Sequence, residues 1–244
     1  STLRKKRGQK LSQEKTQEDK ADIQIICDVF SQGVLYASQK LKEYLGFEDP
    51  QSKFHLSMHT LNEIFLVNFI SFCVEKGVEE RITTSKMTKQ QSLLFGVDWV
   101  WTLSGADKQI RLQIAVQSLQ MAELPNEEQA FEIIGSNTEA MVPDELFGNK
   151  SRFERLEEFC NLVGSKCLGL FIMFGVPGKP KEIRGVVLDS IKKEKQKNLL
   201  SGENALRVFA LNTDSFLPTR EMLEYCLSKK NGMREVGKVY INFL

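Results

Sequence analysis

Two histidines and a glutamate are spaced in this sequence as metal ligands on a helix would be. His55, His59 and Glu63 recur at intervals of four residues, which would align them on one helical face as a zinc site requires. Residues 60–63 read Thr-Leu-Asn-Glu, and this pattern predicts a capping box at the start of a helix. A helix that begins at Thr60 leaves both histidines in the preceding loop and gives Glu63 a structural role. We therefore expect solvated loop histidines and no metal site.

Cysteine is the other residue type that could supply chemistry. The cysteines are Cys27, Cys73, Cys160, Cys167 and Cys226. An odd count without a Cys-x-x-Cys pair or a disulfide framework indicates reduced thiols in the cytosol. A cysteine nucleophile needs a base such as histidine, and the only two histidines share one loop. A cryptic hydrolase that uses Cys160 or Cys167 with His55 is therefore the less favoured alternative to a protein without enzymatic activity.

Gly178 and Lys179 resemble the end of a phosphate-binding loop. That motif needs an earlier glycine and a final Ser or Thr, but Met173 and Pro180 occupy those positions. The serine-hydrolase pattern G-x-S-x-G and a dinucleotide fingerprint are also missing from the sequence. The sequence thus predicts no catalytic residue, no bound cofactor and no metal ligand.

The best-defined elements around these residues are a helix and a hairpin. An amphipathic helix is expected over 151–164. It precedes an almost uninterrupted apolar run over 168–176, which is typical of a strand buried on both faces. Turn residues at 177–180 and a second strand at 183–188 complete a β-hairpin. This part of the chain is predicted to serve packing.

A second hairpin is predicted upstream. Residues 98–103 and 110–117 alternate between apolar and polar side chains around a short turn. Trp99 and Trp101 share one side of its first strand, where they could anchor a partner. Such a pair is more often part of the core.

Residues 1–20 are polar and basic, and we expect a disordered tail because they hold too little apolar material to offset the entropy of ordering. The basic residues cluster at Arg4, Lys5, Lys6, Arg7 and Lys10. A nuclear signal or a contact with an anionic membrane are the alternatives. The residues from Gly8 resemble an N-myristoylation signal, but that signal needs the initiator methionine directly before the glycine, and Arg7 stands there.

Three helices are predicted between this tail and the hairpin over 98–117. Residues 21–45 carry apolar side chains at steps of three and four, and residues 83–94 form a helix that Gly96 ends. Residues 61–76 are apolar almost all round, with only a thin polar stripe. That helix is either a central core helix or a core helix that also shows one face to a partner.

The remaining segments complete the predicted domain. Residues 122–149 are acidic and contain no basic residue, which indicates a flexible loop. A strand is expected at 206–211, a helix at 218–230 and a strand at 239–243. The order of elements predicts an α+β fold: one globular domain over 21–244, with N-terminal helices followed by a mostly antiparallel sheet of about six strands with packed helices.

Composition narrows the function further. Lys and Arg (33) nearly balance Asp and Glu (32), so no net field favours binding to nucleic acid. Every apolar run is shorter than the roughly 18 residues that span a bilayer. We expect a cytoplasmic interaction protein.

Several segments resemble the Rab-fifteen effector protein family of vertebrates. They are residues 39–47, 86–89, 94–101, 108–117, 159–162, 177–181, 184–190 and 235–240. The resemblance implies a non-enzymatic adaptor that binds GTP-bound Rab GTPases and regulates recycling of receptors, such as the transferrin receptor, from the endocytic recycling compartment. It also implies that the Rab places the protein on early and recycling endosome membranes. Whether the basic tail adds a membrane contact is left open.

An effector of this kind must contact the switch segments that the γ-phosphate of GTP orders in a Rab. We expect a patch of excess apolar and aromatic residues from the second helix, the third helix or the tryptophan hairpin to do so. The predicted contact residues are Phe65, Phe69, Met87, Phe95, Trp99 and Trp101, with Lys86 and Lys89 on the rim.

Overall fold

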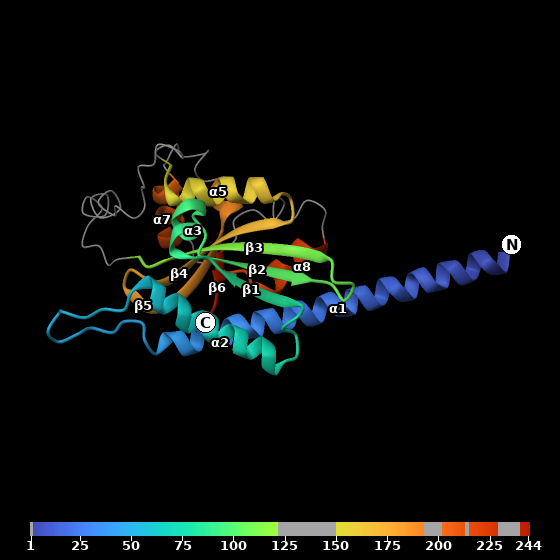
Figure 1. Cartoon of the computed structure of the whole chain (residues 1–244), viewed down its shortest axis with the longest axis horizontal. Coiled ribbons are helices and arrows are strands. Elements are labelled where there is room, and N and C mark those ends of the chain that lie inside the picture. Colours follow the sequence, from blue (N-terminus) through green and yellow to red (C-terminus); the bar gives the residue numbers. More distant parts are fainter. Residues whose placement is uncertain (1, 122–149, 193–201, 213–214, 229–239) are drawn as a thin grey trace.

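The structure, a computed structural model, describes residues 2–121, 150–192, 202–212, 215–228 and 240–244. The predicted acidic loop at 122–149 lies outside the described residues. Within the described ranges the chain forms one sheet that has helices on both faces (Figure 1).

Six strands form this sheet, and their order across it is their order along the chain. They are β1 (Ile82–Lys86), β2 (Trp99–Ser104), β3 (Ile110–Leu119), β4 (Cys167–Val176), β5 (Lys179–Val187) and β6 (Tyr240–Asn242). Neighbouring strands are antiparallel except β3 and β4, which are parallel. A parallel pair needs a long crossover connection, and helix α5 (Arg152–Val163) lies in that crossover. The predicted α+β fold with a mostly antiparallel sheet is confirmed.

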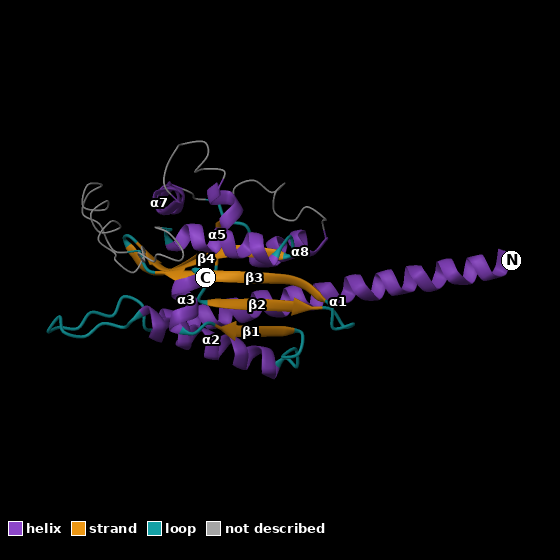
Figure 2. Ribbon diagram, turned by 45° about the horizontal axis from the view of Figure 1, so that its top comes forward, coloured by secondary structure: helices purple, strands orange, loops and turns teal. Residues whose placement is uncertain are grey.

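The helices divide into two layers with the sheet between them (Figure 1), and Figure 2 shows β1 to β4 side by side in this sheet. One face of the sheet carries α1 (Thr2–Lys42), α2 (Met58–Glu75) and α8 (Thr219–Ser228), and the other carries α3 (Lys89–Phe95), α5 and α7 (Gly202–Asn212). We call them the α2 face and the α5 face. Side chains alternate along a strand, so Trp99 and Trp101 lie in the core of the α2 face and Val100 in that of the α5 face.

Strand β4 is buried on both faces, as its apolar run predicted. Leu170 and Ile172 belong to the core of the α2 face and Phe171 to that of the α5 face. Phe171 stacks on Phe153 of α5, with the ring centroids 5.2 Å apart. The predicted helix before β4 and both predicted hairpins are confirmed.

Residues 2–20 are helical, which corrects the predicted disordered tail. They form the first half of α1, continuous with the predicted helix over 21–45, and all their side chains are exposed. This half projects beyond the rest of the molecule (Figure 1). The segment is rich in Gln, Glu, Lys and Arg and has no proline, so the helix nucleated by the packed half propagates through residues of good helix propensity. In the described part of the chain no helix has both the length and the apolar content to cross a membrane.

The predicted helix over 83–94 is a strand followed by a shorter helix. Thr83 and Thr84, whose β-branched side chains favour a strand, lie in β1. Helix α3 begins after Thr88, which forms a capping box with Gln91: the side chain of each accepts a hydrogen bond from the backbone N–H of the other. This box marks the boundary that the sequence analysis missed.

The predicted strand over 206–211 is helical and belongs to α7. Its buried residues Leu206, Phe209 and Ala210 follow the spacing of a helix face, but a short apolar segment fits both kinds of element. In their described parts, the predicted C-terminal helix and strand are confirmed as α8 and β6.

Candidate partner-binding surface

Four of the predicted contact residues lie in the core of the α2 face. Phe65 and Phe69 of α2 meet Trp99 and Trp101 of β2, and each of the four is 0% exposed. The ring centroids are 5.8 Å apart for Phe65 and Trp99 and 4.9 Å apart for Phe69 and Trp101. The interpretation of the tryptophan pair as core is confirmed. These rings support a surface and do not form one.

The other four predicted residues are divided between the two sides of the sheet. Lys86, at the end of β1, reaches the α2 face, where its Nζ lies 3.0 Å from a carboxylate oxygen of Glu63. Met87 and Phe95 pack against the core of the α5 face, and Lys89 is exposed at the start of α3. The structure therefore does not bring the eight residues into one surface.

The open apolar side of α2 lies opposite its buried phenylalanines. Val67, Ile70 and Val74 are 59%, 43% and 55% exposed, and their spacing of three and four residues places them on one side of the helix. The sheet covers one side of α2 and leaves this side in solvent. Of the two alternatives from the sequence, α2 is thus a core helix that also shows an apolar face.

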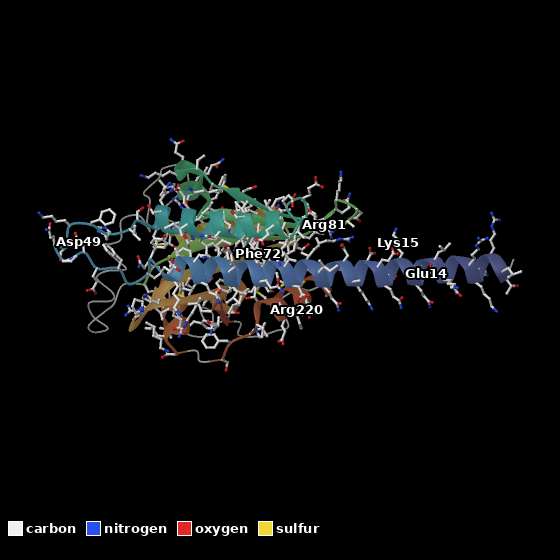
Figure 3. All side chains as sticks on the ribbon, turned by 90° about the horizontal axis from the view of Figure 1, so that it is seen from below. Glu14, Lys15, Asp49, Phe72, Arg81 and Arg220 are labelled. Carbon is white, nitrogen blue, oxygen red and sulfur yellow. The ribbon has the colours of Figure 1, made fainter. Side chains whose placement is uncertain are left out.

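An aromatic pair lies on another side of α2, where this helix meets α1. Tyr36 of α1 lies beside Phe72 of α2, with the ring centroids 5.4 Å apart, and both side chains are partly exposed. Figure 3 shows Phe72 where the two helices run side by side. The Nζ of Lys40 lies 5.7 Å from the Tyr36 ring and that of Lys76 lies 5.5 Å from the Phe72 ring, as in cation–π contacts. The helices approach closely at Gly33, where a Cβ atom would lie 3.1 Å from the Phe72 ring.

We use the name α1–α2 surface for the outer part of both helices, with Val67, Ile70 and Val74 on the open side of α2 and Tyr36 and Phe72 along the contact between the two helices. Charged groups surround it, with Lys40 and Lys76 near the aromatic pair and Lys86 beside the first turns of α2. An exposed apolar area with a charged rim is typical of a protein interaction site.

The start of α2 corrects the predicted position of one histidine. The helix begins at Met58, because the Oγ of Ser57 accepts a hydrogen bond from the N–H of Thr60 and caps it. His59 therefore lies in the first turn and not in a loop. His55 lies in the preceding loop, as predicted.

His59 and Glu63 form an ion-pair cluster. The Nε2 of His59 lies 2.6 Å from Oε1 of Glu63, and the same oxygen accepts a hydrogen bond from Lys86. The hydrogen bond and charge of Lys86, followed by the charge of His59, lower the pKa of Glu63. Among the residues that the structure describes, no group of three or more side chains could hold a metal ion.

Cys160 and Cys167, the nucleophiles of the alternative hydrolase, lie next to each other. Their Sγ atoms are 3.8 Å apart, and Cys160 is buried in the core of the α5 face. Each sulfur thus has a second sulfur as its neighbour. A hydrolase with a cysteine nucleophile instead needs the thiol beside an imidazole.

The exposed residues of α2 could have been found from its polar stripe. The phenylalanines were predicted contacts because large aromatic rings dominate interfaces, but the same rings also dominate cores. Ser71 lies in the thin polar stripe of the helix, and Val67 and Val74 are its neighbours four residues before and three residues after. The apolar residues that border a polar stripe are the ones that meet solvent.

The described residues form a layered α+β fold with an open apolar surface on α2, a feature found in protein-binding modules. The Rab15 effector family model matches residues 11–243. The Rab15 effector protein from Mus musculus is 48% identical over 238 residues, which cover 97% of this chain and all of the mouse protein. The chain therefore belongs to the Rab15 effector family, which confirms the resemblance seen in the sequence and supports a role as a Rab effector.

Proposed function

We propose that this chain is a non-enzymatic effector that binds GTP-loaded Rab GTPases through its α1–α2 surface. Family membership supports the Rab as the partner. The open apolar side of α2, formed by Val67, Ile70 and Val74, is the observation that supports this position for the Rab contact. Burial of such side chains against a partner removes apolar area from water, which favours association.

Selectivity for the GTP form requires a surface that contacts the switch segments only when they are ordered. The γ-phosphate holds both switches, and they relax after hydrolysis. A rigid effector surface gains affinity because it loses little entropy on binding. The open side of α2 is rigid in this sense, because the buried rings of Phe65 and Phe69 fix the helix on Trp101 of β2.

Charged residues at the rim set orientation and association rate more than affinity. Lys86 is retained from the sequence analysis as a proposed rim contact, and Lys40 and Lys76 are added at the aromatic pair. Met87, Lys89 and Phe95 lie toward the α5 face or the start of α3 and are left out of the proposed surface.

The proposed cellular role is regulation of receptor recycling, such as that of the transferrin receptor, from the endocytic recycling compartment. The Rab would hold the chain on early and recycling endosomes, and the basic first turns of α1 would add a second contact. Arg4, Lys5, Lys6, Arg7 and Lys10 are exposed on the projecting half of α1. Cations at a helix N-terminus oppose the helix dipole, so these residues do not stabilise the helix. Each of them contributes about 1 kcal/mol to binding near an anionic membrane surface.

Vesicle sedimentation tests this second contact. Replacement of these five basic residues by glutamine should reduce binding of the full chain to phosphatidylserine vesicles, with neutral vesicles as the reference. Lys5→Gln with Lys6→Gln should cost more binding than Lys15→Gln with Lys20→Gln, which removes the same charge farther from the start of the helix. Equal loss in both double variants would show that total charge acts and the N-terminal cluster does not.

Calorimetry of the chain against Rab15 tests the effector function. The Rab is loaded with a non-hydrolysable GTP analogue in one experiment and with GDP in another. We expect a Kd of about 1 μM or tighter, near −8 kcal/mol, for the GTP form alone. Equal binding to both forms would mean that the switches are not read, and no binding to either form would overturn the proposal.

A further inference from the structure

Two cysteines on the α5 face are close enough to react with each other. Cys160 lies in the last turn of α5 and Cys167 is the first residue of β4. Their Sγ atoms are 3.8 Å apart. A disulfide bond is about 2.05 Å long, so the two sulfur atoms have to approach by about 1.8 Å to bond.

The local backbone makes this approach possible. Gly169 of β4 lies under the end of α5, and a Cβ atom there would be 3.2 Å from the Sγ of Cys160. The missing side chain leaves room for that sulfur against the strand. The N–H of Cys167 donates to the carbonyl of Gly164 at 3.1 Å, which keeps the turn between the two cysteines tight.

The two thiols have different environments. The hydrogen bond between the two thiols lowers the pKa of Cys167, which is also the more exposed of the two. That hydrogen bond, followed by burial, raises the pKa of Cys160. A thiolate with access to solvent beside a second thiol is the arrangement found in redox-sensitive cysteine pairs.

The other three cysteines provide an internal comparison. Burial is the main cause that raises the pKa of Cys27, Cys73 and Cys226 to about 12. All three pack with the core of the α2 face, on the far side of the sheet. They should therefore react much more slowly than Cys167.

We propose that Cys160 and Cys167 form a redox-active dithiol site that hydrogen peroxide converts into an intramolecular disulfide. The Cys167 thiolate attacks one peroxide oxygen, the O–O bond breaks, and a sulfenic acid forms while the released hydroxide takes up a proton to become water. The sulfur of Cys160 then displaces the hydroxyl group of the sulfenic acid, loses its own proton and forms the S–S bond with release of a second water. Two thiols are oxidised and one peroxide is reduced to two waters. A dithiol reductant reverses the reaction by thiol–disulfide exchange.

The bond would fix the end of α5 to the start of β4. It would lie on the face of the sheet opposite the α1–α2 surface. This site is independent of the proposed Rab contact, so its test needs no Rab.

Peptide mapping of the peroxide-treated full chain tests the proposal. Trypsin cleaves after Lys166, so Cys160 and Cys167 fall on separate peptides, 156–166 and 167–181, unless a disulfide joins them. After alkylation of free thiols under denaturing conditions, we expect the joined pair, lighter by two hydrogen atoms. It should form at a peroxide concentration about tenfold lower than the one that oxidises Cys27, Cys73 or Cys226.

Three variants serve as controls. Cys160→Ser and Cys167→Ser should each abolish the joined peptide, and Cys160→Ser should leave a sulfenic acid on Cys167 that dimedone traps. Cys226→Ser should leave the joined peptide unchanged. The proposal is overturned if both peptides are recovered separately alkylated when the other cysteines are already oxidised, or if the cross-link joins two chains.

Discussion

Helices α2 and α5 lie on opposite faces of one sheet, and their outer sides differ. Helix α5 buries Phe153 and Leu156 and turns the charged side chain of Glu158 to solvent. Helix α2 buries its phenylalanines and turns Val67 and Val74 to solvent. An amphipathic helix such as α5 is complete once its apolar side is covered. The comparison shows that α2 has an apolar side that the described part of the chain leaves open.

The inner sides of the two layers also differ. On the α5 face, the Asp98 carboxylate accepts hydrogen bonds from Ser92 Oγ at 2.8 Å and from the Ser118 N–H at 2.7 Å, and it pairs with Arg152 at 3.2 Å. On the α2 face, the buried rings of α1, α2 and β2 meet at the centre, and Arg81 bonds to Asp22 of α1 and to the carbonyl of Ser104. Directional polar bonds thus position α3 and α5, whereas packing of large rings holds α2.

The largest effect on this comparison should come from Trp101→Ala. The ring of Trp101 lies 4.8 Å from that of Phe30 and 4.9 Å from that of Phe69, measured between centroids. Its removal should lower the free energy of unfolding by about 3–5 kcal/mol, as for other large aromatic truncations in cores. Urea unfolding measures the change, and Trp101→Phe should recover part of it. A loss below about 1 kcal/mol would contradict the placement of this ring at the centre of the α2 face.

Asp98→Ala should destabilise the α5 face by about 2–3 kcal/mol. The substitution leaves the Arg152 guanidinium and the Ser118 N–H without their partner, and buried groups that lose a partner cost about this much. Arg152 is partly exposed, which keeps the figure below that of a fully buried pair. Glu158→Ala removes the exposed ion pair with Lys150 and is the control, with an expected change of about 0–0.5 kcal/mol.

Ile70→Asp should weaken binding to GTP-loaded Rab15 about tenfold or more, which is about 1.4 kcal/mol. A carboxylate on the open side of α2 would have to be desolvated at the interface, while the unfolding free energy should stay near that of the wild type. Leu162→Asp is the matched control, because Leu162 is an apolar residue that is 81% exposed on α5, away from α2. Equal loss of affinity in both variants, or in neither, would remove the difference that we assign to the two helices.

The smallest effect is expected from Glu63→Gln at the edge of the α1–α2 surface. Lys86 and His59 lower the pKa of Glu63 below its ordinary value of 4.5. A carboxylate with a lowered folded-state pKa stabilises the fold above the unfolded-state pKa, and this contribution is lost as the pH falls through the folded-state value. The Tm of the variant should therefore lie slightly below that of the wild type at pH 7, and the difference should vanish well below pH 4.5. A difference that persists at low pH would show that packing causes it.

Local patterns in the sequence were sufficient for much of the fold. The alternation in β2 and β3, the apolar run of β4 and the amphipathic period of α5 each identify one kind of element. These patterns failed where a segment was short or contained two kinds of element. Residues 83–94 contain both β1 and α3, and 206–211 carries an apolar segment that suits a strand or a helix. In the first case the Thr88 capping box was the missed signal. In the second case only packing against α5 shows that the segment is a helix.

The sequence by itself determined that α2 is apolar almost all round and that large aromatic residues concentrate in α2 and β2. The thin polar stripe of α2 was a weak signal for which side is exposed, because a helix without a polar half gives little direction to its period. The tertiary structure decided this by placing Phe65 and Phe69 on the tryptophans of β2, which left Val67, Ile70 and Val74 in solvent. The pairing of Cys160 with Cys167 is likewise a tertiary fact, since it depends on how α5 returns to β4 over Gly169. Local preferences select the elements, but contacts between elements decide which side chains are covered and which can meet a partner.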